Sequence, residues 1–184
     1  MRSFLLFAAA AATTASLLAA PLPAAVHAAP GPSGDIPDNQ VFLQFTSTAG
    51  HWSIRYPEGW ARTGSSAGRS ASVSFRDRGN SVRVAVAPGA TPTSASVTSG
   101  VRAIRGSHPV GRARSVKLSG GAAVKLTYTT IGAPDPVTGK RLTISTDRYQ
   151  LGHTGRVATI DLSTPVGVDN VDAFRLISDS FRWR

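Results

Sequence analysis

The sequence predicts an α+β domain with a mainly antiparallel sheet of about six to seven strands and two main helices. Apolar residues alternate with polar ones in several segments, which is typical of strands with one buried face. Most links between these segments are too short to hold a crossover helix, so neighbouring strands are expected to run antiparallel. Helical patterns are few and late, unlike the regular alternation of a doubly wound sheet.

The first 28 residues have the features of a secretory signal peptide. Arg2 precedes an Ala- and Leu-rich segment from Phe4 to Leu18, and Val26 and Ala28 have the spacing of a small-residue cleavage site. Thr and Ser residues interrupt the apolar segment, whereas a membrane anchor needs about 20 apolar residues. We therefore expect cleavage after Ala28, rather than an uncleaved anchor, and a mature chain (29–184) without a transmembrane segment.

Residues 29–40 are rich in Pro and Gly and predict a linker that precedes a domain at 41–184. The first ordered segment is expected near Val41. Alternating aromatic and polar residues then predict a strand at 52–56, which ends at a turn containing Pro57.

A hairpin and a helix are expected next. Segments 72–76 and 82–86 alternate regularly and flank Asp-Arg-Gly-Asn at 77–80, a strong turn signal. Thr93 or Ser94 then provides the N-cap of a helix. The apolar residues of this helix recur at spacings of four and three, at Val97, Val101 and Ile104.

The second half of the chain is expected to be mostly strand. Alternating segments at 110–118, 122–130, 140–151 and 156–162 predict four further strands. A final helix is expected to begin at Asp169 or Asn170 and to close near Asp179. Its apolar face carries Val171, Phe174 and Ile177.

Composition excludes several classes of chemistry. The chain has no cysteine, so it has no disulfide, thiolate metal site, Cys nucleophile or thioether-lipid anchor. Its net charge is +10, and it becomes +9 once the leader with Arg2 is removed. Such an excess suits an anionic partner. Nucleic acid is not expected, because the chain is exported and lacks a basic motif interleaved with aromatic residues.

A family resemblance is carried by short aromatic motifs. The segment GHWSIRYPEGW at 50–60 resembles the opening strand of PsbP-like proteins with their Y-P-x-G-W turn, and VSFRD at 73–77 and NSVRV at 80–84 continue it. The closing helix followed by Ser180-Phe181 extends the resemblance over residues 41–184. It implies an α/β/α sandwich, as in PsbP, the Mog-type Ran-binding factor and LpqN-type lipoproteins. Because these relatives bind different partners, it implies a non-enzymatic accessory role without choosing the ligand.

No catalytic or metal-binding pattern emerges from the residues. His51, His108 and His153 lie far apart in the sequence, and the chain has neither an H-x-x-x-H pair nor a G-x-S-x-G elbow. Glu58, the only Glu, lies in the Y-P-E-G-W turn. We therefore expect no enzymatic activity, no metal site and no cofactor. Calcium enters consideration only through the family resemblance.

Positive charge is the strongest candidate binding feature. Arg55, Arg76, Arg83 and Lys125 are expected on one polar face of the sheet. This face is a candidate for contact with an anionic envelope lipid or polymer or an acidic protein, with a merely solvated surface as the alternative. Trp60 is a further candidate, as a pocket or rim residue.

These features predict a secreted, bacterial, non-enzymatic PsbP-like binding or accessory domain at the cell envelope. Two alternatives stay open. One is an extrinsic subunit of photosystem II, as in the oxygen-evolving complex. The other is an envelope hydrolase that uses Glu58 or a serine.

Overall fold

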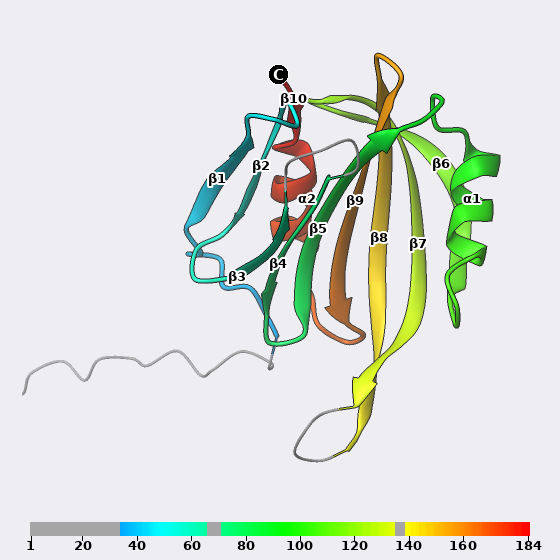
Figure 1. The fold of residues 1–184 in the computed structure, drawn as a ribbon. Coiled ribbons are helices and arrows are strands. Elements are labelled where there is room, and N and C mark those ends of the chain that lie inside the picture. The colour runs from blue at the N-terminus through cyan, green and yellow to red at the C-terminus, as the bar shows by residue number, and fades with distance from the viewer. Residues whose placement is uncertain (1–33, 66–70, 135–138) are drawn as a thin grey trace, which may run out of the picture.

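The structure is a computed structural model that describes residues 34–65, 71–134 and 139–184. The predicted signal peptide (1–28) lies outside the described residues. The described chain forms a seven-stranded sheet of order β3-β4-β5-β9-β8-β7-β6 and a three-stranded sheet of order β1-β2-β10 (Figure 1). All paired strands are antiparallel. The α+β class with a mainly antiparallel sheet is thus confirmed.

The strands of the large sheet are β3 (Ala61–Ser65), β4 (Ala71–Asp77), β5 (Asn80–Pro88), β6 (His108–Leu118), β7 (Gly121–Pro134), β8 (Arg141–His153) and β9 (Arg156–Pro165). Those of the small sheet are β1 (Phe42–Ser47), β2 (Trp52–Pro57) and β10 (Arg182–Trp183). The helices are α1 (Ser94–Arg102) and α2 (Val171–Asp179). Two of these strands, β3 and β10, were not expected from the sequence.

Tight turns set the register of two hairpins in the large sheet. Between β4 and β5, Arg78 and Gly79 both have positive φ angles (46° and 91°), as a type I′ turn requires. Thr154 and Gly155 repeat this pattern between β8 and β9 (44° and 72°). The predicted hairpin at 72–86 is confirmed, and its glycine supplies the left-handed conformation that a two-residue connection needs.

Helix α1 begins at a capping box. The Thr93 side chain accepts a hydrogen bond from the Ser96 amide (3.1 Å), and the Ser96 hydroxyl accepts one from the Thr93 amide (2.9 Å). Val97 and Val101 are fully buried against β6 and β7. This packing stabilises a nine-residue helix whose Ser, Thr and Gly content makes it weak in isolation.

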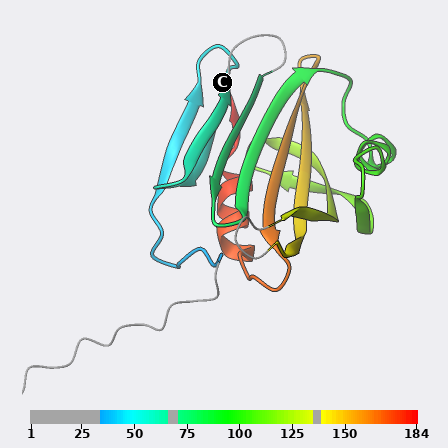
Figure 2. The ribbon, with the colours of Figure 1, turned by 60° about the horizontal axis from the view of Figure 1, so that its bottom comes forward.

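The described elements form three layers, with the large sheet in the middle. One face of this sheet, here called the α2 face, is covered by α2 and the small sheet. The opposite face, here called the α1 face, is covered by α1 only over β6 and β7. Figure 2 shows α1 nearly end-on beside these strands and well away from α2. This arrangement agrees with the α/β/α sandwich that the family resemblance implied.

The core lies mainly on the α2 face. Most of its members come from β2, β4, β5, β8, β9 and α2, and they include Ile54, Phe75, Val84, Leu151, Ile160 and Ile177, none of which is exposed. A second, smaller cluster lies under α1 and consists of Val97, Val101, Val124, Leu126 and Tyr128. Two apolar clusters therefore hold the middle layer from both sides.

This division corrects the expectation that one face of a single sheet is polar. Trp52 and Ile54 lie in the small sheet, which packs over the α2 face, rather than in the large sheet itself. On β7, Leu126 and Tyr128 point to the α1 face, so Lys125 points to the α2 face. The physical reason is that β7 packs its Leu126 side under α1 and turns its Lys125 side to the opposite face, and alternation alone does not say which face of the sheet an apolar set occupies.

Residues 34–40, which the sequence placed in the linker, pack on the domain. Ile36 is buried in the core, and its amide donates a hydrogen bond to the Asn170 side chain (2.8 Å). The side-chain amides of Asn80 and Asn170 both donate hydrogen bonds to the Gly34 carbonyl. The packed structure therefore begins before residue 41.

Strand β6 forms one edge of the large sheet and is irregular. Its register with β7 shifts between Val110 and Arg114, where Gly111 has a φ of 74°. Such a bulge bends an edge strand and raises its local twist. The exposed side chains of β6 include Arg112, Arg114 and Lys117.

Candidate functional site

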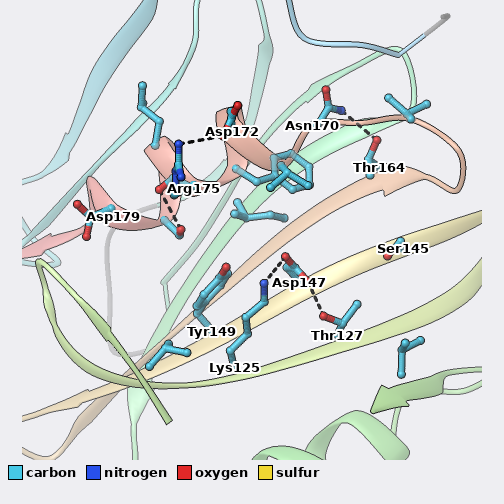
Figure 3. A pocket seen from close by; sticks show the side chains of 18 of the residues that line it. Lys125, Thr127, Ser145, Asp147, Tyr149, Thr164, Asn170, Asp172, Arg175 and Asp179 are labelled. Carbon is cyan, nitrogen blue, oxygen red and sulfur yellow. Dashed lines mark hydrogen bonds and ion pairs between the residues drawn. The ribbon is translucent and has the colours of Figure 1, made fainter. Parts of the chain in front are cut away.

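A cleft of about 1230 Å³ lies between α2 and the α2 face of the large sheet. Strands β7 and β8 form its floor, α2 and the loop before it form one wall, and β6 forms the other. In Figure 3, side chains of β7 and β8 point toward those of α2 across this space. The small sheet packs over the part of the α2 face that the cleft does not occupy, so the cleft lies beside the small sheet.

A partly buried ion pair lies on the cleft floor. Lys125 Nζ lies 2.7 Å from Asp147 Oδ2, and the Thr127 hydroxyl donates to Asp147 Oδ1 (2.6 Å). The Lys125 ammonium also lies 5.1 Å from the centre of the Tyr149 ring. The two charged side chains are only 18% and 23% exposed (Figure 3). Residues from two neighbouring strands thus place a paired positive charge at the bottom of the cleft.

Lys125 keeps its proton in this setting. Burial lowers the pKa of Lys125, but its hydrogen bonds to Asp147 and Tyr149 raise it, and the net shift is upward from the ordinary value. The floor therefore presents a fixed ammonium group that one carboxylate and one phenol already contact.

Apolar side chains dominate the walls. Val110, Val166, Val171 and Leu176 all line the cleft, with exposures of 39–70%. They make up half of the large exposed apolar side chains in the described part of the chain. Apolar residues scattered singly on a surface need no explanation, whereas a contiguous apolar patch marks a binding groove or an interface.

Charged residues at the rim differ in how they are paired. On α2, Arg175 Nη2 lies 2.9 Å from Asp172 Oδ1 in an exposed pair. Across the cleft, Arg114 and Lys117 on β6 make no ion pair with any residue that the structure describes. The β6 side of the rim is therefore free to contact an acidic group.

Asp179 closes the end of the cleft and gives a prediction for acid pH. Its carboxylate accepts hydrogen bonds from the Ser119 amide (2.8 Å) and hydroxyl (2.9 and 2.8 Å), which hold the pKa of Asp179 below its ordinary value. Its contribution to stability is thus present above the unfolded-state pKa and is lost as pH falls through the lower folded-state pKa. We expect Asp179→Asn to flatten the acid limb of stability against pH, measured by urea unfolding below about pH 4. An unchanged acid limb would contradict this account.

A second, smaller hollow of about 320 Å³ lies where β2, β10 and the C-terminal end of α2 meet. It is lined by Gln44, Ser53, Arg55, Leu176, Asp179, Ser180, Arg182 and Arg184. Leu176 and Asp179 also line the large cleft, so the last turns of α2 separate the two spaces.

The four basic residues expected on one face do not lie together. Arg76 and Arg83 share the α1 face, where Arg83 Nη1 lies 3.7 Å from Asp161 Oδ2. Lys125 lies on the opposite face of the same sheet, and Arg55 lies in the small sheet. The shared basic face is thus wrong as a geometric expectation, because the four residues belong to two sheets and to both faces of the larger one.

Trp60 is also placed differently from the prediction. Its side chain is 8% exposed and belongs to the main core cluster. It lines neither the cleft nor the hollow. The turn that carries it brings the ring inward, since the residue follows Gly59 with a φ of 85° and leads directly into β3.

Sequence reasoning missed Asp147 and Tyr149. A usable signal was present, because an acidic residue in the middle of a long predicted strand needs a partner when that strand is central. Pairing the predicted strands 122–130 and 140–151 as a hairpin would have brought Asp147 beside Thr127 and Tyr149 beside Lys125, as the register shows. The register of β7 with β8 could not be predicted, because the length of the connection between the two strands does not fix it.

Other chemistry finds little support in the described ranges. Within 34–65, 71–134 and 139–184, no three His, Asp or Glu residues lie close enough to hold a metal ion. Glu58 is exposed in the turn after β2, away from both the cleft and the hollow. No helix in these ranges is long and apolar enough to cross a membrane.

Comparisons with known proteins place the fold. Among solved structures, the chain is similar to cyanobacterial PsbP (CyanoP) from Synechocystis sp. PCC 6803, with a TM-score of 0.53 and 18% identity over 84% of this chain and 100% of that one. The chain has a PsbP-like fold. The resemblance inferred from residues 50–60 and the later motifs is therefore confirmed at the level of the fold.

Two other structures are similar at lower scores. A protein from Bacteroides thetaiotaomicron has a TM-score of 0.46 and 12% identity, over 77% of this chain and 48% of that one. LpqN, described as involved in cell envelope biogenesis of Mycobacterium tuberculosis, has a TM-score of 0.36 and 15% identity, over 81% and 80%. No protein-family model and no curated protein matches the sequence.

Proposed function

We propose that this chain is a non-enzymatic binding domain that works outside the cytoplasm, at the cell envelope, and takes its ligand in the cleft beside α2. The observation that carries the proposal is the cleft itself, with exposed apolar walls around a partly buried, charged floor. The PsbP-like fold and the secretory features of residues 1–28 support the accessory role and the location.

The lining favours an amphipathic ligand with an acidic group. Val110 and Leu176 stand on opposite walls and offer apolar surface to a chain or ring. Arg114 and Lys117 stand at the rim without an ion pair in the described part of the chain, and Lys125 stands on the floor. An anionic envelope lipid matches both features better than a purely polar polymer does, because a polymer would leave the apolar walls in water.

Blocking the cleft tests this proposal. Ser145 lies on β8, the strand between β7 and β9, and lines the cleft floor (Figure 3). Ser145→Trp would place an indole ring in the cleft. Dodecanoate serves as the probe, and its binding is measured by calorimetry. We expect saturable binding to the unmodified protein, loss of that binding in Ser145→Trp, and weaker binding of the cationic dodecyltrimethylammonium.

Ser81→Trp is the matched control. Ser81 is a half-buried strand residue on the α1 face, where it cannot reach the cleft. The Ser81→Trp variant should bind dodecanoate with the same affinity as the unmodified protein. Equal binding by Ser145→Trp and Ser81→Trp, or no saturable binding to the unmodified protein, would count against the cleft as the ligand site.

A further inference from the structure

Three arginines converge on the small hollow beside the C-terminal end of α2. Arg182 lies opposite Ser53 in the pairing of β10 with β2, and Arg55 follows Ser53 by two residues. The Arg184 amide donates to the His51 carbonyl (2.8 Å), which continues this pairing. Because residues two apart in a strand point to the same side, Arg55, Arg182 and Arg184 share the face that points away from the core, and all three line the hollow.

One of the three guanidinium groups is held in place by the backbone. Arg182 Nη1 donates hydrogen bonds to the carbonyl oxygens of Asp179 and Phe181, the second at 2.8 Å. Carbonyl groups at the C-terminal end of a helix attract cations, so the end of α2 fixes this arginine between the other two. A fixed donor loses little conformational freedom when a ligand arrives.

The positive charge of the hollow is only partly balanced. Arg55 and Arg184 make no hydrogen bond or ion pair through their side chains with any described residue. Asp179 is the one acidic side chain that lines the hollow, and its charge offsets only one of the three arginines, because the Ser119 amide and hydroxyl that donate to it are neutral. Three like charges around about 320 Å³ repel one another unless an anion lies between them.

We propose that this hollow binds a phosphate group, either as free inorganic phosphate or as a phosphomonoester headgroup on a surface. A phosphate carries about two negative charges and three terminal oxygens, so several arginines can donate to it from different directions. A planar carboxylate is satisfied by the fork of a single arginine and leaves the other two without a partner. Ser53 and Gln44 add neutral polar groups to the lining.

The test compares two variants that remove equal charge. Arg55→Gln with Arg184→Gln takes two positive charges from the hollow and leaves Arg182 in place. Arg102→Gln with Arg105→Gln takes two exposed charges from the end of α1 and the turn after it, on the other side of the large sheet. Each protein is titrated with inorganic phosphate by calorimetry at low salt. Each is also mixed with vesicles of phosphatidylcholine alone or of phosphatidylcholine with phosphatidic acid.

Loss of at least about tenfold in phosphate affinity in the hollow variant, with a change below about twofold in the α1 variant, would support the proposal. Binding to phosphatidic acid vesicles with the same dependence, but not to free phosphate, would also support it and identify a surface headgroup as the source. Equal weakening in both variants would overturn the proposal, because net charge alone would then explain binding. Absence of binding to both probes would overturn it as well.

Discussion

Asp161→Ala is expected to lower the free energy of unfolding by about 3–5 kcal/mol. Asp161 lies on the α1 face and accepts two hydrogen bonds from Arg148, from Nε (2.7 Å) and Nη2 (2.8 Å). Both side chains are buried, at 9% and 11% exposure. An arginine does not lose its proton inside a protein, so removing the carboxylate leaves a charge that the fold cannot neutralise. Urea unfolding followed by tryptophan fluorescence measures the loss.

The exposed pair on α2 provides the control for this prediction. Asp172 and Arg175 are 84% and 78% exposed, so Asp172→Ala should cost at most about 1 kcal/mol. The difference between the two variants isolates the effect of burial from that of charge. Similar losses in Asp161→Ala and Asp172→Ala would show that burial of the Arg148 pair adds nothing.

Trp52→Ala should cost about 3–5 kcal/mol and lower the melting temperature by about 10 °C. Trp52 is fully buried between the two sheets, with its ring centre 5.3 Å from that of Phe45 and 6.2 Å from that of Phe181. Its removal opens a cavity where the small sheet meets α2 and the large sheet. Thermal unfolding followed by circular dichroism provides the measurement.

A conservative variant separates packing from hydrogen bonding at this position. Trp52 Nε1 is buried and has no hydrogen-bond partner among the described residues. Trp52→Phe keeps much of the aromatic contact and removes this unpaired donor, so it should cost clearly less than Trp52→Ala. Val41→Ala, at a position that is 55% exposed, should be nearly neutral. A Phe variant as unstable as the Ala variant would contradict the packing explanation.

Local signals in the sequence predicted the elements whose conformation is decided locally. The Asp77 to Asn80 turn fixes its hairpin, because only positive φ angles at its two central positions match the twist of the strands. Thr93 fixes the start of α1 through its own side chain. Strands with regular alternation, such as β5, also lie where the pattern placed them.

Relations between elements were harder to predict. The five residues of β3 are all exposed and show no apolar alternation, so their pairing with β4 leaves no trace in the sequence pattern. Strand β10 has only two residues, Arg182 and Trp183, which is too short to show alternation, although it forms the third strand of the small sheet. The sequence pattern does not predict the small sheet. It therefore does not predict which part of the α2 face the small sheet leaves open as the cleft.

The site depended on the same relations. Lys125 was singled out correctly as a notable cation, but its partner Asp147 lies 22 positions later and meets it only through the register of β7 and β8. Likewise Arg182 and Arg184 are far from Arg55 in the sequence, and their approach to Arg55 requires the small sheet. Charge patterns name candidate residues, whereas tertiary pairing decides which of them share a surface.

The irregular β6 edge has a consequence for the behaviour of the protein at high concentration. A long, flat edge strand offers unpaired backbone groups to a second molecule and promotes aggregation. Strand β6 has a bulge at Gly111, a proline at position 109 and exposed cations at Arg112 and Arg114, each of which opposes edge-to-edge pairing. The opposite edge, β3, has only five residues. Part of the chain's excess of arginine thus lies on an open sheet edge, where positive charge opposes pairing between molecules.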